Sequence, residues 1–180
     1  MNIILFGFKG AGKTHFGRLL ALKIHRPFID TDDLILELYA KEAGQRKKAK
    51  QIYAELGKVA FRDLEKRAVQ TLKGVENSVI AVGGGTVVDP ENVAVLQKVG
   101  ALVYLKAGSE TIKKRIFKEE LPAFFDKNDP EGSFLAMVHE REPIYRSIAA
   151  RVVDVDLLDE AGVLAALSSI LLLEEPPNGF

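Results

Sequence analysis

The residues with the clearest chemical potential are 7–14, which read GFKGAGKT and follow the apolar run 2–6. This segment matches the phosphate-binding pattern G-x-x-x-x-G-K-[ST] in full. The glycines allow backbone angles that turn successive amide groups around a phosphate, and the positive end of the following helix points at the same place. Lys13 supplies a charge for the terminal phosphates and Thr14 a hydroxyl for Mg²⁺. The sequence therefore predicts a site for a nucleoside triphosphate and a magnesium ion.

Carboxylates follow the second apolar run of the chain. Residues 30–33 read DTDD and come directly after 27–29. Side chains at the carboxyl end of a parallel strand face the ligand crevice, so we expect Asp30 near the metal and Asp32 near an acceptor hydroxyl. A cluster of aspartates that caps the next helix would explain the same residues equally well.

Two arginines are candidates for binding an anionic acceptor. Arg62 and Glu65 are three residues apart, so on a helix they can pair and fix the guanidinium for a carboxylate. An ordinary surface pair has the same spacing. Arg141 lies in a later helical stretch and is a candidate for the second cationic contact, although an isolated arginine is more often a solvated surface residue.

A run of glycines follows the third apolar segment, 78–82. Gly83, Gly84 and Gly85 carry no side chains, so a small ligand can lie directly against their backbone. A flexible turn is the alternative interpretation of this run.

Short apolar runs alternate with longer helical stretches along the chain. The apolar runs predict strands at 2–6, 27–29, 78–82, 101–105 and 151–155. The stretches between them predict helices at 13–24, 32–41, 59–72, from 89–91 onward, at 109–117 and at 160–173, followed by a frayed tail at 176–179. This alternation predicts an α/β fold in which helices cover both faces of a parallel sheet.

Composition limits the classes of protein that the chain can belong to. Its 180 residues suit one domain, 1–180, and a hydrophobic fraction of 47% is enough for a core. It has no cysteine and a formal net charge of zero, which argues against disulfides and against a nucleic-acid partner. The basic stretch 46–50 is interpreted as a solvated face. We see neither a signal peptide nor a membrane span, and expect a cytoplasmic protein.

Together the motifs resemble the shikimate kinase family. That family carries, in this order, a P-loop, an Asp-Thr-Asp, a Phe-Arg-x-x-Glu, a Gly-Gly-Gly and an Arg-x-Pro-x-Tyr. The matching segments here are 7–14, 30–32, 61–65, 83–85 and 141–145, and the resemblance covers about 2–154. Five motifs in one order are far more specific than any one of them.

The resemblance implies a fold and a reaction. The fold is a three-layer α/β sandwich with a five-stranded parallel sheet, the P-loop NTP hydrolase fold of the nucleoside-monophosphate-kinase type. The reaction transfers the γ-phosphoryl group of ATP, with Mg²⁺, to the 3-hydroxyl of shikimate on the route to chorismate and the aromatic amino acids. We expect ATP and shikimate as partners, no nucleic acid, no membrane, and a monomer.

The resemblance also implies a role for each motif residue. Nucleotide binding falls to Gly10, Ala11, Gly12, Lys13, Thr14, His15 and Arg115, and metal binding to Thr14 and Asp30. Acceptor binding falls to Asp32, Arg62, Gly83, Gly84, Gly85 and Arg141, and the catalytic residues are Lys13 and Asp32.

Two departures from the family pattern affect the predicted acceptor segment, about 34–62, and the predicted lid, about 118–132. Leu121 occupies the place of a lid arginine that reaches the phosphates in the family, so we expect Lys118 or Lys127 to replace its charge. Lys58 occupies the place of a glutamate.

Two other functions fit parts of the pattern. One is a kinase of another small polyol, such as gluconate, on the same fold, although motifs 61–65 and 83–85 argue against it. The other is a nucleotide-binding module without catalysis, which the loss of the lid arginine at Leu121 would permit. A substrate panel and a turnover assay would separate these alternatives.

Overall fold

Five parallel strands form one sheet in the computed structural model, which describes residues 1–119 and 121–172. The strand order is β2-β3-β1-β4-β5. The strands are β1 (Asn2–Phe6), β2 (Phe28–Asp30), β3 (Val79–Ala81), β4 (Gly100–Lys106) and β5 (Arg151–Asp154). Each end differs from the sequence prediction by at most one residue. The predicted five-stranded parallel sheet is therefore confirmed.

The central strand β1 explains why the first apolar run is continuous. It pairs with β3 on one side and β4 on the other, and Ile3, Ile4, Leu5 and Phe6 have no exposed surface. A strand that is covered on both faces has no solvent side on which polar residues could alternate. The P-loop that follows β1 therefore starts from the most buried part of the sheet.

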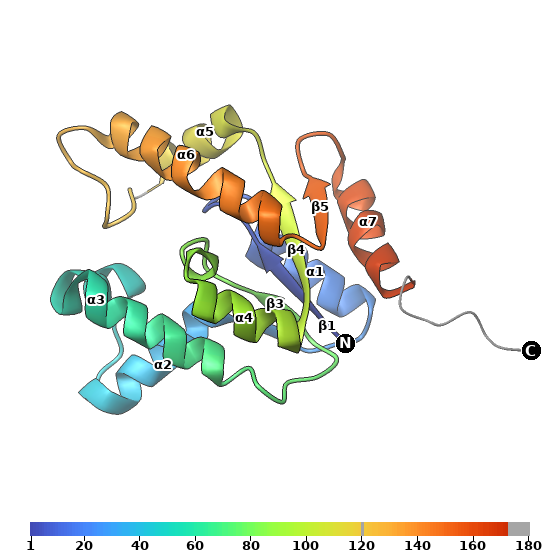
Figure 1. Ribbon diagram of the computed structural model, residues 1–180, viewed down its shortest axis with the longest axis horizontal. Coiled ribbons are helices and arrows are strands. Elements are labelled where there is room, and N and C mark those ends of the chain that lie inside the picture. The colour runs from blue at the N-terminus through green and yellow to red at the C-terminus, as the bar shows by residue number, and fades with distance from the viewer. Residues whose placement is uncertain (120, 173–180) are drawn as a thin grey trace, which may run out of the picture.

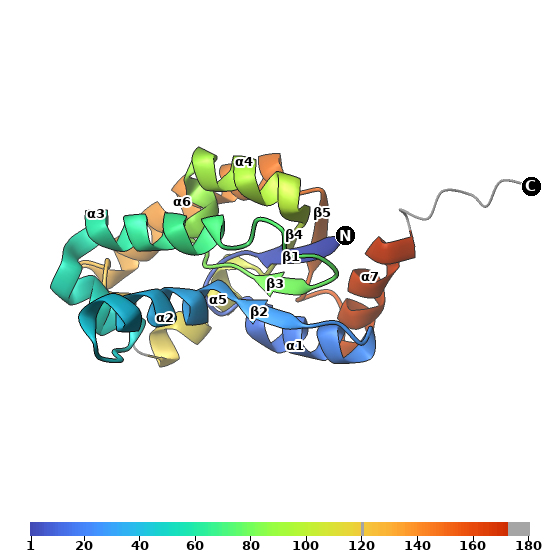
Figure 2. The ribbon, with the colours of Figure 1, turned by 90° about the horizontal axis from the view of Figure 1, so that it is seen from below.

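Helices cover both faces of this sheet (Figure 2). They are α1 (Lys13–Lys23), α2 (Thr31–Ala43), α3 (Ala49–Gln70), α4 (Pro90–Val99), α5 (Ser109–Lys118), α6 (Pro130–Ile148) and α7 (Glu160–Leu172), with a short 3₁₀ helix, η1 (Thr86–Val88). Figure 2 shows α1 and α7 on one side of the sheet and α4 on the other, which gives the predicted three layers. The pairs α2–α3 and α5–α6 extend beyond the carboxyl ends of the strands (Figure 1).

Helix α3 is longer than the sequence pattern indicates. The prediction began it at 59, whereas it begins at Ala49 and changes direction at Gly57, whose φ of 75° and ψ of 173° are not helical. Gly57 inside the helix and the basic stretch 46–50 obscure the helical periodicity of its first part in the sequence. Ile52 from this first part packs with Ile35 and Tyr39 of α2 in a second, smaller hydrophobic core. This core holds α2 and α3 together as a unit beside the main one.

Two remaining expectations concern the C-terminus and membranes. Leu173, predicted to end the last helix, and the tail 176–179, predicted to be frayed, lie outside the described residues. In the part of the chain that the structure describes, no helix is both long enough and apolar enough to cross a lipid bilayer.

Candidate active site

The phosphate-binding loop is folded around its own lysine. Gly7, Gly10 and Gly12 have φ values of 145°, 84° and 91°, which side chains rarely tolerate. The Lys13 ammonium donates to the carbonyl oxygens of Gly7 and Phe8 at 3.1 and 3.0 Å. Loss of hydration lowers the pKa of Lys13, while the negative charges of Asp32 and Asp30 act in the opposite direction. The charge is thus held in place inside the loop.

The structure brings the two predicted metal ligands together. The Thr14 hydroxyl donates to Asp30 Oδ2 at 2.8 Å. Asp30 is also the N-cap of α2, where Oδ1 accepts from the Asp32 amide at 3.1 Å. The capping role that its sequence position left open is therefore confirmed, and the same side chain lies beside the Thr14 hydroxyl. Hard cations such as Mg²⁺ prefer oxygen ligands of this kind, so the pair fits a magnesium ion that keeps several waters. No group of three or more His, Asp or Glu suited to a metal occurs among the described residues.

A cavity of about 530 Å³, the P-loop cavity, opens at this point. Its lining residues are Lys9, Gly10, Gly12, Lys13, Thr14, His15, Asp30, Asp32, Ala81, Val82, Gly83, Gly84, Arg115 and Glu119. Of the residues predicted to bind nucleotide, only Ala11 is absent from the lining, because it is buried behind the loop. Arg115 donates to the Gly10 carbonyl at 2.6 Å, and His15 lies 2.8 Å from Glu160 at the start of α7.

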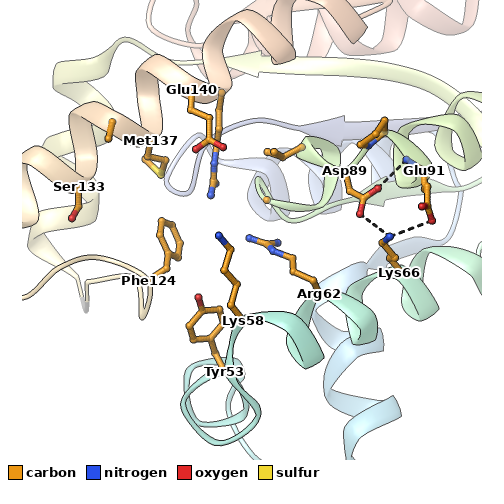
Figure 3. A pocket seen from close by; sticks show the side chains of 15 residues that line it. Tyr53, Lys58, Arg62, Lys66, Asp89, Glu91, Phe124, Ser133, Met137 and Glu140 are labelled. Atoms are coloured by element: carbon orange, nitrogen blue, oxygen red, sulfur yellow. Dashed lines mark hydrogen bonds and ion pairs between the residues drawn. The ribbon is translucent and has the colours of Figure 1, made fainter.

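A second cavity, the arginine cavity, has a volume of about 730 Å³ (Figure 3). Its lining residues are Tyr53, Lys58, Arg62, Lys66, Gly85, Val88, Asp89, Pro90, Glu91, Phe124, Ser133, Ala136, Met137, Glu140 and Arg141. Residues from α3, the lid and α6 meet here, and the two predicted acceptor arginines line the same space. Sequence reasoning missed Tyr53, Phe124 and Met137, since nothing in their local pattern distinguishes them from core residues.

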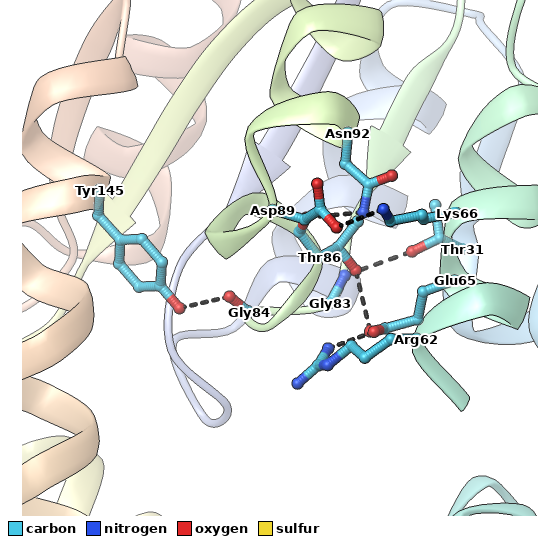
Figure 4. A network of polar contacts seen from close by, with 10 residues as sticks. All are labelled: Thr31, Arg62, Glu65, Lys66, Gly83, Gly84, Thr86, Asp89, Asn92 and Tyr145. Atoms are coloured by element: carbon cyan, nitrogen blue, oxygen red, sulfur yellow. Dashed lines mark hydrogen bonds and ion pairs between the residues drawn. The ribbon is translucent and has the colours of Figure 1, made fainter. Parts of the chain in front are cut away.

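Arg62 is fixed by a buried carboxylate (Figure 4). It forms an ion pair with Glu65, which is only 5% exposed and also accepts from the Thr86 hydroxyl at 3.2 Å. Burial raises the pKa of Glu65, while the Arg62 charge lowers it. Gly85 makes this arrangement possible, because a Cβ atom there would clash with the Arg62 guanidinium. The spacing of Arg62 and Glu65 thus marks a built contact and not a loose surface pair.

Arg141 reaches the same cavity with spare hydrogen-bonding capacity. Its Nε is buried, and among the described residues it has no hydrogen-bond partner. Its guanidinium carbon lies 5.1 Å from the centre of the Phe124 ring, which comes from the lid. A buried donor without a partner is costly, so this geometry suits an anion that arrives from outside the protein.

The glycine turn 83–85 joins the two cavities. Gly83 and Gly84 line the P-loop cavity, whereas Gly85 lines the arginine cavity. The Tyr145 hydroxyl donates to the Gly84 carbonyl at 2.7 Å, and burial raises the pKa of Tyr145 to about 12. A Cβ on Gly84 would lie 2.8 Å from the Gly7 carbonyl oxygen. Tyr145 was not predicted as a site residue, although its place in the motif 141–145 offered a signal.

Asp32 lies near this junction. A Cβ on Gly83 would lie 3.4 Å from Asp32 Oδ1, so its carboxylate faces the glycine turn. The cleft leaves Asp32 open to water. Nevertheless, the protein packed around its carboxylate weakens its hydration and, together with the negative charge of Asp30, raises its pKa to about 6 against the opposing charge of Lys13. The group is therefore ionised at neutral pH but close to titration, as suits a proton acceptor.

The lid contains no arginine at the expected place. Leu121 is half-buried and packs against the main core. Neither Lys118 nor Lys127 is among the lining residues of the P-loop cavity, whose cationic side chains are Lys9, Lys13 and Arg115. Lys9 pairs at 3.5 Å with Glu119, which follows α5.

Comparisons with known proteins agree on one family. A sequence model of the shikimate kinase family matches residues 9–171, a range that contains every lining residue of both cavities. A shikimate kinase from Syntrophus aciditrophicus is 37% identical over 175 residues, covering 91% of this chain and 87% of that relative. Another, from Caldanaerobacter subterraneus subsp. tengcongensis, is 41% identical over 145 residues and 81% of each chain. The solved shikimate kinase from Acinetobacter baumannii in complex with shikimate matches with a TM-score of 0.84 and 27% identity, covering 98% of this chain and 95% of that one.

Proposed function

The chain belongs to the shikimate kinase family, and we propose that its two cavities transfer the γ-phosphoryl group of ATP to the 3-hydroxyl of shikimate. It is an ATP-dependent phosphotransferase, on the route to chorismate and the aromatic amino acids. The observation that carries the proposal is the junction of the cavities at the turn 83–85. An acceptor anchored by Arg62 and Arg141 would lie beside phosphates bound at the P-loop.

The nucleotide occupies the P-loop cavity in this proposal. The loop amides and the start of α1 bind the phosphates, and Lys13 turns from the carbonyls of Gly7 and Phe8 toward the β- and γ-phosphates. Arg115 lies at the rim of this cavity on α5, where it can contact the adenine. His15, beside Lys13 and Thr14, completes the nucleotide site.

Thr14 and Asp30 would hold Mg²⁺, Thr14 directly and Asp30 either directly or through water. When bound, the ion would offset the negative charge that develops on the phosphate oxygens. The hydrogen bond between these two residues keeps the hydroxyl and the carboxylate at the edge of the P-loop cavity, ready for such a ligand.

The acceptor occupies the arginine cavity in this proposal. Arg62 and Arg141 bind its carboxylate, and the backbone of Gly83, Gly84 and Gly85 faces its ring. Asp32 orients the hydroxyl and accepts its proton as the oxygen bonds to the γ-phosphorus. The bond from that phosphorus to the bridging oxygen breaks at the same time, and ADP leaves. Such transfer depends on positioning and charge neutralisation, which the two fixed arginines and Lys13 provide.

Further proposals concern the whole chain. Residues 1–180 act as one kinase domain, in which about 34–62 is the acceptor-binding segment and about 118–132 is the lid. The protein acts as a monomer in this proposal. Because its co-substrate ATP is a cytoplasmic metabolite, we place the enzyme in the cytoplasm, with ATP and shikimate as partners and neither nucleic acid nor membrane.

An acceptor panel tests the proposed reaction. The purified protein is incubated with Mg-ATP and, in turn, shikimate, gluconate or no acceptor, and the products are identified by ³¹P NMR. We expect a phosphate ester on the 3-hydroxyl of shikimate only. Phosphorylation of gluconate instead would contradict the acceptor assignment, and no product with any acceptor would indicate a binding module.

A further inference from the structure

Helix α3 presents a row of cationic side chains to the arginine cavity. Lys58, Arg62 and Lys66 are spaced four residues apart, so they lie on one face of the helix, and all three line the cavity. Figure 3 shows the side chains of Lys58 and Arg62 pointing into the same space, with Phe124 to one side and Glu140 across from them. The change of direction at Gly57, directly before Lys58, starts this row.

The three members of the row differ in how far their charges are neutralised. Lys66 lies 3.0 Å from Asp89 and 3.2 Å from Glu91, and Arg62 is paired with Glu65. The ammonium of Lys58 is exposed and has no ion-pair partner among the described residues. Lys58 therefore brings an uncompensated positive charge to the wall that carries Arg62.

The opposite wall has a similar surplus. In the described part of the chain, Arg141 has a buried Nε without a hydrogen-bond partner. Glu140 is the one acidic lining residue on that wall, against Asp89 and Glu91, which Lys66 already engages. The Arg141 guanidinium and the Lys58 ammonium, which have no ion-pair partner among the described residues, thus face a cavity with one unengaged carboxylate among its lining residues.

We propose that Lys58 is a specificity-determining residue, a third cationic contact for the carboxylate of the acceptor. The proposal rests on the proposed function, since it adds a residue to the same acceptor site. Lys58 selects acceptors that carry a negative charge on the side remote from the phosphorylated hydroxyl. It stabilises the bound ground state and the transition state equally, because it does not line the P-loop cavity, where the transferred phosphoryl group would lie.

The test compares Lys58→Met with Lys23→Met, which removes the same charge from the exposed end of α1, outside both cavities and outside the proposed acceptor segment. We expect Lys58→Met to raise the KM for shikimate about five- to tenfold, with kcat and the KM for ATP unchanged. Lys58→Arg restores the KM. Salt screens the attraction between the cavity and the acceptor carboxylate. Because the wild type has one more positive charge than Lys58→Met, its KM for shikimate should rise more steeply with salt. Lys23→Met behaves as the wild type in every measurement.

Two results would overturn the proposal. One is a KM for shikimate in Lys58→Met within twofold of the wild type, with the same salt dependence. The other comes from Glu140→Gln, which should lower this KM or leave it unchanged, because it removes a charge that repels the carboxylate. If Glu140→Gln instead raises the KM as Lys58→Met does, the two residues form a bridge that closes the cavity and Lys58 does not contact the ligand. A wild-type protein that phosphorylates no shikimate would overturn the proposed function itself, and is recognised before any variant is made.

Discussion

The P-loop cavity and the arginine cavity differ in how completely their polar groups are satisfied. In the P-loop cavity, Lys13 binds two carbonyl oxygens, Thr14 binds Asp30, and Arg115 binds the Gly10 carbonyl. In the arginine cavity, Arg141 keeps a buried donor without a partner in the described residues. The polar groups of the P-loop cavity thus already have hydrogen-bond partners within the protein, whereas the arginine cavity retains a buried donor that suits an anion.

The two cavities should therefore differ in how well they tolerate amino-acid substitutions. A change in the P-loop disturbs backbone angles and several hydrogen bonds at once. A change on the face of α3, such as lysine at 58, alters the charge of the arginine cavity while the second core under α2 and α3 stays intact. We expect acceptor recognition to be adjustable and phosphate recognition to be fixed.

The largest effect is expected in the P-loop cavity. Lys13→Ala removes the charge beside the transferring phosphoryl group, and we expect kcat to fall about a thousandfold or more. The fold should persist, because the glycine angles do not depend on the lysine. Steady-state kinetics and circular dichroism check both statements, and turnover within tenfold of the wild type in a folded variant would refute the role of Lys13.

The arginine cavity should respond in affinity for one ligand only. Arg62→Ala and Arg141→Ala are each expected to weaken shikimate binding by about 2–5 kcal/mol, because a charge on the partner is left uncompensated. ATP binding should change little. Arg146→Ala is the matched control, since Arg146 lies on the same helix but pairs at 2.8 Å with Glu142 on an exposed face. If calorimetry shows that shikimate and ATP lose equal affinity, the two arginines do not bind the acceptor specifically, and the assignment of one ligand to each cavity is wrong.

The carboxylate at the junction should show a pH effect. The pKa of Asp32, about 6, lies above its ordinary value of 3.8, so ionising this group opposes folding. Asp32→Asn should therefore raise the melting temperature by a few degrees above pH 6, and the gain should disappear as the pH falls toward 4. Turnover should fall at the same time, and the loss of wild-type kcat/KM below about pH 6 should be absent from the variant.

The opposite effect of Asp32→Asn on stability would contradict the proposed role of this carboxylate. If Asp32→Asn destabilises the protein at pH 7.5, the carboxylate is a structural partner of its neighbours and is not a proton acceptor with a raised pKa. Thermal melts between pH 4 and pH 8, with Asp33→Asn as the neighbouring control, distinguish the two.

The smallest effect is expected in the lid. If a lysine replaces the missing arginine, Lys118→Ala or Lys127→Ala should lower kcat several-fold with little change in ATP affinity, as for a contact made mainly in the transition state. Leu121→Arg should raise kcat or leave it unchanged. Full turnover in both alanine variants would mean that neither lysine takes part and that the lid acts by excluding water.

The sequence alone predicted the sheet and the P-loop better than the arginine cavity, for a physical reason. Contiguous motifs such as 7–14 carry their geometry in local backbone angles, and the continuous apolar runs mark buried strands directly. The first part of α3 was missed, because its helical pattern is interrupted at Gly57 and its stability comes from packing of Ile52 on α2. Contacts of that kind are set by the tertiary fold.

The same distinction applies to individual site residues. Asp30 was predicted near the metal from its strand end, and the structure adds that the same side chain caps α2. The contact of Tyr145 with Gly84 and the position of Phe124 over Arg141 join residues that are far apart in the chain. No local spacing encodes such pairs. Lys58 was visible in sequence only as a departure from a pattern, and its place in the cavity gives that departure a meaning.

The central claim is that phosphoryl transfer occurs between the two cavities across the turn 83–85. A coupled assay of ADP release, run with Mg-ATP alone and then with shikimate added, measures this most directly. We predict negligible release with ATP alone and rapid, saturable release on adding shikimate, with one ADP formed per shikimate consumed. ADP release at the same rate with and without shikimate would contradict the claim, because the acceptor would then play no part in the reaction.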